Sequence, residues 1–229
     1  VDAQGGQYGN VLQAAARAGN ESVVRLLLER GAKVKAQGGQ YGNALQAAAA
    51  GGNESVVRLL LGNGADVAAR GGHCGNALQA AVVRRNESVV RLLLKNGADV
   101  NSPEGRYGTA LCAAVHGRNE SIARLLLEHG AELNTQGNTL HEAAVRGSRS
   151  VVRCLLDHGA KVNAEHKSYG NALHAAVVGG DGSVVRLLLD HDAAVNAQGG
   201  SYGNALQAAA AIGNKHVVQL LLKSGADVN

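Results

Sequence analysis

The sequence predicts an all-α solenoid, in which short helix-turn-helix repeats stack on one another along the chain. Three observations favour this fold class: a similar segment recurs every 33 residues, hydrophobic residues make up 45% of the chain, and aromatic residues make up only 2%. Stacked repeats bury their apolar faces against their neighbours. Thin layers of Ala, Val and Leu fill such a core without aromatic rings.

A leucine at the start of each predicted first helix marks the repeat: Leu12, Leu45, Leu78, Leu111, Leu140, Leu173 and Leu206. The spacing is 33 residues, except for 29 between Leu111 and Leu140. We therefore divide the chain into seven repeats, 1–33, 34–66, 67–99, 100–132, 133–161, 162–194 and 195–229, and interpret 1–229 as one domain. The short fifth repeat lacks four residues between Asn134 and Asn138, where we expect a gap in the row of turns.

Each repeat contains the same elements in the same order, as the second one illustrates. Gly38 and Gly39 predict a turn, and Asn43 predicts the N-cap of a first helix over 44–50, which glycines at 51–52 end. Asn53 predicts the cap of a second helix. The apolar stripe of that helix comprises Val56, Val57, Leu59, Leu60 and Leu61.

Two stretches follow the pattern of a known family. Residues 140–144 read L-H-E-A-A, within a frame of the type T-P-L-H-x-A-A, and residues 97–101 read G-A-D-V-N. The sequence thereby resembles the ankyrin repeat family, whose period is 33 residues, over its whole length. This resemblance implies β-hairpin fingers, a concave groove between the fingers and the first helices, and a non-enzymatic protein-binding scaffold. It also implies that the His141 and His174 rings bond locally to the turn backbone.

A finer resemblance concerns the motif YGNALQAA and the near-identity of neighbouring repeats. These features are similar to the repeat arrays of fungal nucleotide-oligomerisation-type (NACHT/STAND) receptors. That resemblance implies that the chain is the recognition segment of a fungal NLR-like receptor. Two other interpretations stay open: a structural spacer or tether without a dedicated ligand, and a designed consensus-like array.

The residue pattern does not predict an enzyme, a cofactor site or a metal site. The three cysteines share no C-x-x-C spacing, and the glycines lack a phosphate-binding pattern. His129, His158 and His191 occupy one column of successive repeats, about 10 Å apart, which is too far to share a metal. Cys154 replaces a leucine of the apolar stripe, so we expect it to be buried. We expect no nucleic acid, no membrane span, and a cytoplasmic location.

Arginines recur on the predicted second helices, at positions 25, 58, 91, 124, 153 and 186. A glutamate precedes each of the first four by four residues, at positions 21, 54, 87 and 120. This spacing predicts ion pairs within each helix. We therefore interpret this arginine ladder as a solvated outer face rather than a nucleic-acid stripe.

Positions of the repeat whose residue differs from one repeat to the next, here called variable columns, are not constrained by packing. They are therefore available for binding. Residues 67–153 hold 11 basic and 7 acidic residues, so the positive excess of the chain is central. Arg85 and Arg118 stand where other repeats have the glycine that ends the first helix. We predict an acidic protein partner in the concave groove. The predicted contact residues are His73, Arg84, Arg106, His116 and Arg146.

The first repeat presents an apolar face without polar replacements, comprising Leu12, Val23, Val24 and Leu27. The chain also begins at Val1 without an initiator methionine. Exposed apolar end faces limit the solubility of solenoids. We therefore expect either further repeats before Val1 or self-association through the uncapped N-terminal repeat.

Overall fold

The structure is a computed structural model that describes residues 5–133, 139–167 and 169–228. Contacts between residues divide the chain into two compact units. The first compact unit comprises Val1–Gly117 and Glu128–Ala131, and the second comprises Arg118–Leu127 and Glu132–Asn229. The gap predicted in the fifth repeat, between Asn134 and Asn138, lies outside the described residues.

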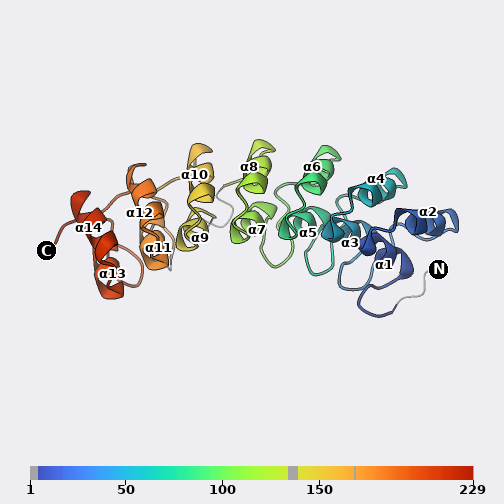
Figure 1. The fold of residues 1–229 in the computed structure, drawn as a ribbon, viewed down its shortest axis with the longest axis horizontal. Helices are drawn as coiled ribbons and strands as arrows, with labels where there is room; N and C mark the ends of the chain where they lie inside the picture. Colours follow the sequence, from blue (N-terminus) through green and yellow to red (C-terminus); the bar gives the residue numbers. More distant parts are fainter. Residues whose placement is uncertain (1–4, 134–138, 168, 229) are drawn as a thin grey trace. The chain divides into compact units, whose positions relative to one another are not determined.

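The described residues form fourteen α-helices and no strand (Figure 1). The helices are α1 (Val11–Ala18), α2 (Glu21–Glu29), α3 (Ala44–Gly51), α4 (Glu54–Gly62), α5 (Ala77–Val83), α6 (Glu87–Lys95), α7 (Ala110–His116), α8 (Glu120–Glu128), α9 (Thr139–Val145), α10 (Arg149–Asp157), α11 (Ala172–Gly179), α12 (Gly182–Leu189), α13 (Ala205–Ile212) and α14 (Lys215–Lys223). The all-helical fold predicted from the sequence is confirmed.

The first helices begin and end as predicted. The Asn43 side chain accepts a hydrogen bond from the backbone N–H of Gln46 over 2.9 Å, which satisfies a free donor of the first turn of α3. Gly52 ends α3 with φ of +75°, in the left-handed region that favours glycine. Local residue chemistry thus sets both boundaries of this helix.

Small side chains let the first helices pack closely. In the first compact unit α3 contacts both α1 and α5, while α4 contacts both α2 and α6 (Figure 1). In the second, α11 contacts α9 and α13, and α12 contacts α10 and α14. Ala47, Ala48 and Ala49 of α3 are completely buried. Leucines on both kinds of helix, including Leu45 and Leu60, fill the remaining volume.

The second helices differ in how they begin: Asn214 caps α14 through its side chain, whereas α4 begins without the predicted cap bond. Asn53 makes no cap to α4; instead its Nδ2 donates to the carbonyl oxygens of Ala16 at 3.0 Å and Arg17 at 3.1 Å. Asn53 thus occupies the N-cap position of α4 as predicted, but the side-chain cap bond is not formed. The physical reason is that the carbonyls in the last turn of α1 can accept further donors, and the asparagine of the next repeat supplies one; the Ala16 carbonyl also accepts from the Gly19 N–H over 3.2 Å. Asn86 likewise donates to Ala49, over 3.0 Å.

The turns before the first helices are closed by isolated β-bridges: Gly5 with Gly9, Gly38 with Gly42, Gly71 with Gly75, His166 with Gly170, and Gln198 with Asn204. Successive turns approach backbone to backbone. A Cβ added to Gly39, whose φ is +62°, would lie 2.5 Å from the backbone nitrogen of Gly9. Glycine therefore permits the spacing between these turns.

The outer face of the first repeat differs in part from the prediction. Leu12 and Val24 are buried, because the packing of α1 and α2 against each other and against α3 and α4 encloses them. Val23 is exposed as predicted, at 42%, and Leu27 is half-buried. The other large apolar side chains exposed on these two helices are Val11 and Leu26.

Candidate partner-binding surface

Backbone hydrogen bonds join neighbouring turns in the first compact unit. The Gln40 N–H donates to the Gln7 carbonyl over 2.9 Å, and the His73 N–H donates to the Gln40 carbonyl over 2.8 Å. These bonds place one residue of each turn beside its counterpart in the next repeat. His73 therefore has a fixed backbone and an exposed side chain at the edge of this row.

A second set of bonds ties each first helix to the next turn. Gln46 Nε2 donates to the carbonyls of Ala69 and Gly75, both over 3.2 Å. His141 takes the same role in the second compact unit, since its Nε2 lies 3.2 Å from the Gly170 carbonyl, 29 residues later. The His141 ring thus bonds to turn backbone as expected, but the turn is that of the next repeat. His174 forms a bond within its own repeat, where the backbone N–H of Asn171 donates to Nδ1 over 3.3 Å.

Two of the variable positions, Arg106 and His116, contact Tyr107. The Arg106 guanidinium lies over the Tyr107 ring, 4.5 Å from its centroid, and its Nη2 donates to the tyrosine hydroxyl. The His116 ring, at the end of α7, lies 4.7 Å from the Tyr107 ring, centroid to centroid. Arg106 and His116 are both exposed. A cation over an aromatic face is attracted by the ring quadrupole, which holds the guanidinium in place at the surface.

Arg84 joins this group through the turn that carries Cys74. Burial raises the pKa of the Cys74 thiol, while the positive charges of Arg84 and Arg106 oppose that rise. The charges of both guanidinium groups therefore influence the Cys74 thiol, which follows His73 in the chain. We call the set His73, Cys74, Arg84, Arg106, Tyr107 and His116 the basic–aromatic cluster; it lies within the first compact unit.

Arg146, the fifth predicted contact residue, belongs to the second compact unit. It follows α9, and its Nε donates to Oε1 of Glu142, one helical turn earlier. Its side chain is only 29% exposed. The positive charge of Arg146 is thus offset by Glu142. Arg84, in contrast, forms no ion pair among the described residues.

The tyrosines were missed as site residues by the sequence reasoning. They recur at one position of the repeat, as Tyr8, Tyr41, Tyr107, Tyr169 and Tyr202, and Cys74 takes that position in the third repeat. In the structure Tyr8 and Tyr41 stack with ring centroids 6.2 Å apart. Their 33-residue recurrence is the signal that identifies them, because they stand beside the variable columns.

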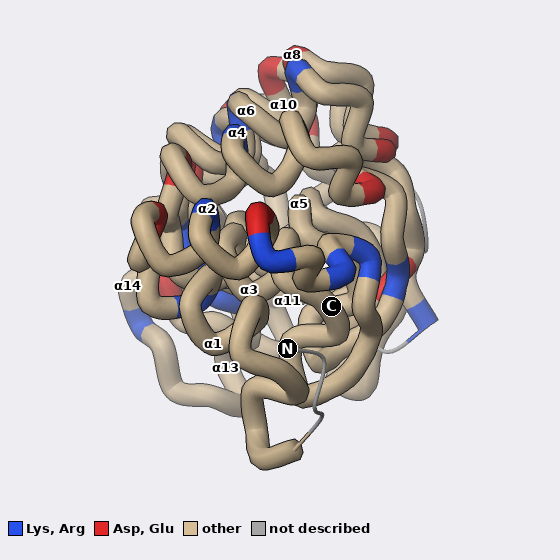
Figure 2. The backbone as a smooth tube through the Cα atoms, turned by 90° about the vertical axis from the view of Figure 1, so that its right-hand side faces the viewer, with Lys and Arg blue, Asp and Glu red and all other residues tan. Residues whose placement is uncertain are grey.

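The arginine ladder forms the predicted ion pairs. Arg58 contacts Glu54 at 2.5 Å, Arg91 contacts Glu87 at 2.7 Å, and the remaining pairs are Arg25 with Glu21 and Arg124 with Glu120, each at 2.9 Å. The hydrogen bond from Arg58 lowers the pKa of Glu54. Figure 2 shows an acidic and a basic position close together on α8. Exposed pairs of this kind stabilise a helix by about 0.3–0.5 kcal/mol.

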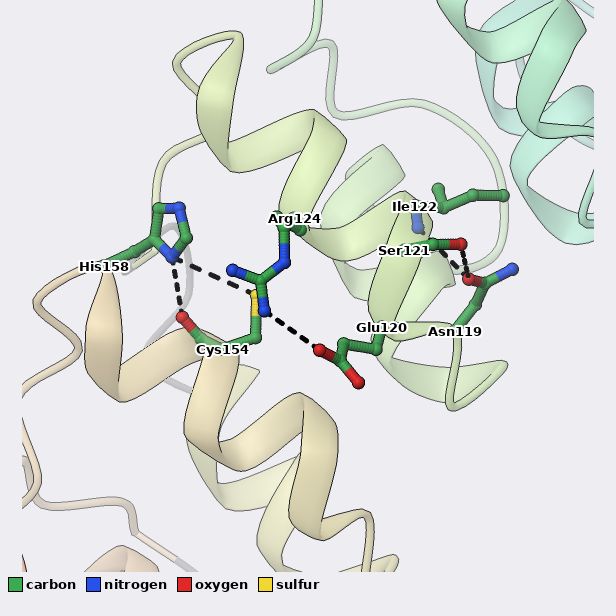
Figure 3. A network of polar contacts seen from close by, with 7 residues as sticks. All are labelled: Asn119, Glu120, Ser121, Ile122, Arg124, Cys154 and His158. Carbon is green, nitrogen blue, oxygen red and sulfur yellow. Dashed lines mark hydrogen bonds and ion pairs between the residues drawn. The ribbon is translucent and has the colours of Figure 1, made fainter.

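Cys154 of α10 and His158, the residue that follows this helix, lie close together, near Arg124 of α8 (Figure 3). Cys154 is fully buried, as predicted. The Nδ1 atom of His158 lies 2.8 Å from the Cys154 carbonyl, which also accepts from the backbone N–H of His158 over 3.2 Å. The hydrogen bond from Arg124 to Glu120 raises the pKa of Arg124. These contacts account for the three residues structurally.

In the described parts of the chain, 5–133, 139–167 and 169–228, no group of three or more His, Cys, Asp or Glu residues is placed to hold a metal ion. No helix in the same residues is long and apolar enough to cross a membrane.

Comparison with known proteins identifies one family. The family model described as ankyrin repeats, three copies, matches residues 12–104, 78–166 and 140–229. Among solved structures, the chain is similar to the crystal structure of the human ASB11 ankyrin repeat domain, with a TM-score of 0.84 and 24% sequence identity. The match covers 96% of this chain and 100% of that one. This likeness concerns the fold alone. A comparison with curated proteins found no match.

Proposed function

Because the chain belongs to the ankyrin repeat family, we propose that it binds an acidic protein partner through the basic–aromatic cluster of its first compact unit. Ankyrin repeats generally mediate protein–protein interactions, and proteins built from them are typically non-enzymatic. The observation that carries the choice of partner is that Arg84 and Arg106 are exposed and that neither forms an ion pair with an acidic residue among the described residues. Together they offer a carboxylate two cationic donors.

The charges of this cluster differ from those of the arginine ladder. Each of the first four ladder arginines already holds a glutamate on its own helix. Arg84 forms no ion pair among the described residues, and Arg106 contacts an aromatic ring. An approaching carboxylate therefore meets uncompensated positive charge at the cluster, which favours fast association with acidic surfaces.

Several finer features belong to the same proposal. The array consists of seven repeats in one domain, with β-hairpin fingers and a concave groove that contains the contact residues. The recurrence of the leucine column and the β-bridges at the turns support this organisation. Arg146 is a further contact, and we expect a smaller contribution from it because Glu142 already pairs with it.

The biological setting is the recognition segment of a fungal NLR-like receptor in the cytoplasm. The YGNALQAA motif and the near-identity of neighbouring repeats support this setting. Self-association through the N-terminal repeat is part of the proposal as well. Its support is the exposure of Val11, Val23 and Leu26, at 49%, 42% and 48%.

The test is binding of a short fluorescent Glu-rich peptide, with a matched Gln-rich peptide as the reference. Arg84→Ala and Arg106→Ala are expected to weaken binding of the Glu-rich peptide, by up to about 2 kcal/mol where the guanidinium is desolvated. They also reduce its salt dependence. Arg58→Ala and Arg91→Ala are the matched controls, since they remove a ladder arginine; we expect changes below about 1 kcal/mol. Loss of binding in the controls with retention in the cluster variants would show that the wrong face was chosen.

A further inference from the structure

A small pocket opens beside α11 and α13 in the second compact unit. Its volume is about 100 Å³, and its walls are two tyrosines, the turn between them and the first helices. The lining residues are Tyr169, His174, Val178, Gly199, Gly200, Ser201, Tyr202 and Ala208. All of them belong to the sixth and seventh repeats, whose first helices, α11 and α13, contact each other.

The first two repeats show what occupies the equivalent place elsewhere in this chain. Tyr8 and Tyr41 correspond to Tyr169 and Tyr202, and Arg17 corresponds to Val178. The Arg17 guanidinium lies over the Tyr41 ring, 5.7 Å from the centroid, and its Nε donates to the Tyr41 hydroxyl over 3.0 Å. The chain's own arginine therefore covers this tyrosine.

In the sixth repeat the covering side chain is missing. Val178 is too short to extend over the next tyrosine, and 41% of its surface is exposed. Tyr202 is 46% exposed, and within the described part of the chain it has no stacking partner and no hydrogen bond through its hydroxyl. The site thus keeps the aromatic face and the hydroxyl that hold Arg17 in the first repeat, without an arginine.

The electrostatics of this end of the chain favour a cation. Apart from His174, no residue that lines the pocket has a side chain that is charged near pH 7. Burial lowers the pKa of His174, which favours the neutral ring. Residues 154–229 contain 5 basic and 6 acidic residues, in contrast to the basic centre of the chain. A cation entering the pocket therefore meets no repulsion from its walls.

We propose that the pocket between Tyr169 and Tyr202 receives an arginine side chain of a partner protein. The guanidinium lies on the Tyr202 ring and donates to its hydroxyl, as Arg17 does at Tyr41. The neutral lining and the tyrosine face favour a guanidinium over a carboxylate. This site goes beyond the proposed function, because it selects a positively charged residue and does not involve the basic–aromatic cluster.

The probe is a short blocked peptide with a single arginine between alanines, and the readout is the amide chemical shift of Gly200 and Tyr202 in NMR titrations. We expect saturable shifts for this peptide, and weaker binding of the matched peptides with leucine or phenylalanine in place of arginine. Val178→Arg places the chain's own arginine over Tyr202 and is expected to reduce binding at least about tenfold. Tyr202→Ala removes the ring and has an effect of similar size, about tenfold.

Ala211→Arg is the matched control. It adds the same charge at the equivalent position of the next repeat, outside the pocket lining, and should leave the arginine peptide bound. The absence of shifts with the arginine peptide would overturn the proposal, as would equal or tighter binding of the leucine or phenylalanine peptide. Since the readout is local to this pocket, a negative result here leaves the Glu-rich peptide test of Arg84 and Arg106 unaffected.

Discussion

The side-chain amide of Asn53 donates to the carbonyl oxygen of Ala16 over 3.0 Å and thereby joins the start of α4 to the end of α1. The same amide nitrogen lies 3.1 Å from the Arg17 carbonyl. An asparagine at a helix start is ordinarily a cap for its own helix. In this chain it connects two repeats, so its contribution is to the interface between them.

We predict that Asn53→Ala destabilises the protein by about 1–2 kcal/mol, because the carbonyls of Ala16 and Arg17 lose the donor that Asn53 supplies. Asn53→Asp should be destabilising as well, since a carboxylate cannot donate, although aspartate is a good cap. Asn20 occupies the same position of the first repeat and makes no cap bond. Asn20→Ala is therefore the control, with an expected change near zero. Urea unfolding measures all three, and equal effects at Asn53 and Asn20 would contradict the interpretation.

Arg85 and Arg118 both adopt positive φ, +60° and +52°, where most repeats have glycine. A non-glycine residue in this region costs about 1 kcal/mol. Arg85 Nη2 donates to the Gly117 carbonyl over 2.6 Å, which offsets part of that cost, whereas Arg118 has no such bond among the described residues. We predict that Arg118→Gly stabilises the protein by up to about 1 kcal/mol and that Arg85→Gly gains less. Thermal melts of the two variants check this order; the reverse order would contradict the role given to the Arg85 bond.

The stability of the second compact unit should fall on acidification because of His174. This side chain is only 3% exposed, and burial lowers its pKa below the ordinary value of 6.5. Because the pKa of His174 is lower in the folded state, the unfolded chain binds a proton more readily than the folded chain. The stability that depends on the neutral ring is therefore fully present above about pH 6.5 and is lost as the pH falls through the folded-state pKa.

His174→Gln is the matched variant, since glutamine takes this position at Gln13, Gln46 and Gln79. We expect the variant to lose less stability than the native chain between about pH 7.5 and pH 5. The difference in urea midpoints at the two pH values is the measurement. An identical pH dependence in both proteins would show that His174 contributes nothing to it.

Unfolding is expected to proceed repeat by repeat, because each repeat contacts only its neighbours. Of the α2 residues only Val24 is buried, whereas α4 buries Val56, Val57 and Leu60. At the other end, Leu222 on α14 is 43% exposed. Native-state hydrogen exchange should therefore show α1, α2, α13 and α14 opening before α3–α6. A single protection level across all helices would contradict this prediction.

The candidate surface was only partly predictable. The variable columns pointed to Arg84, Arg106 and His116, and the structure gathers them around Cys74 and Tyr107. The sequence reasoning left the tyrosine column out of the site, because a residue that is constant between repeats was assigned to packing. Whether a recurring tyrosine contacts a cationic side chain at a variable position depends on the distance between one turn and the next helix. The repeat period of the sequence contains no information on that distance.

The sequence by itself determined the period, the helical class, the starts of the first helices and the ion pairs of the arginine ladder. The period is visible as a direct recurrence of residues, and the helix starts and ion pairs depend on interactions within about four residues, which a local pattern specifies directly. The tertiary structure decided where Asn53 and His141 form their hydrogen bonds and which tyrosine stays uncovered. Those outcomes depend on the offset between neighbouring repeats. Backbone contacts between turns, such as that of Gly39 with Gly9, set this offset.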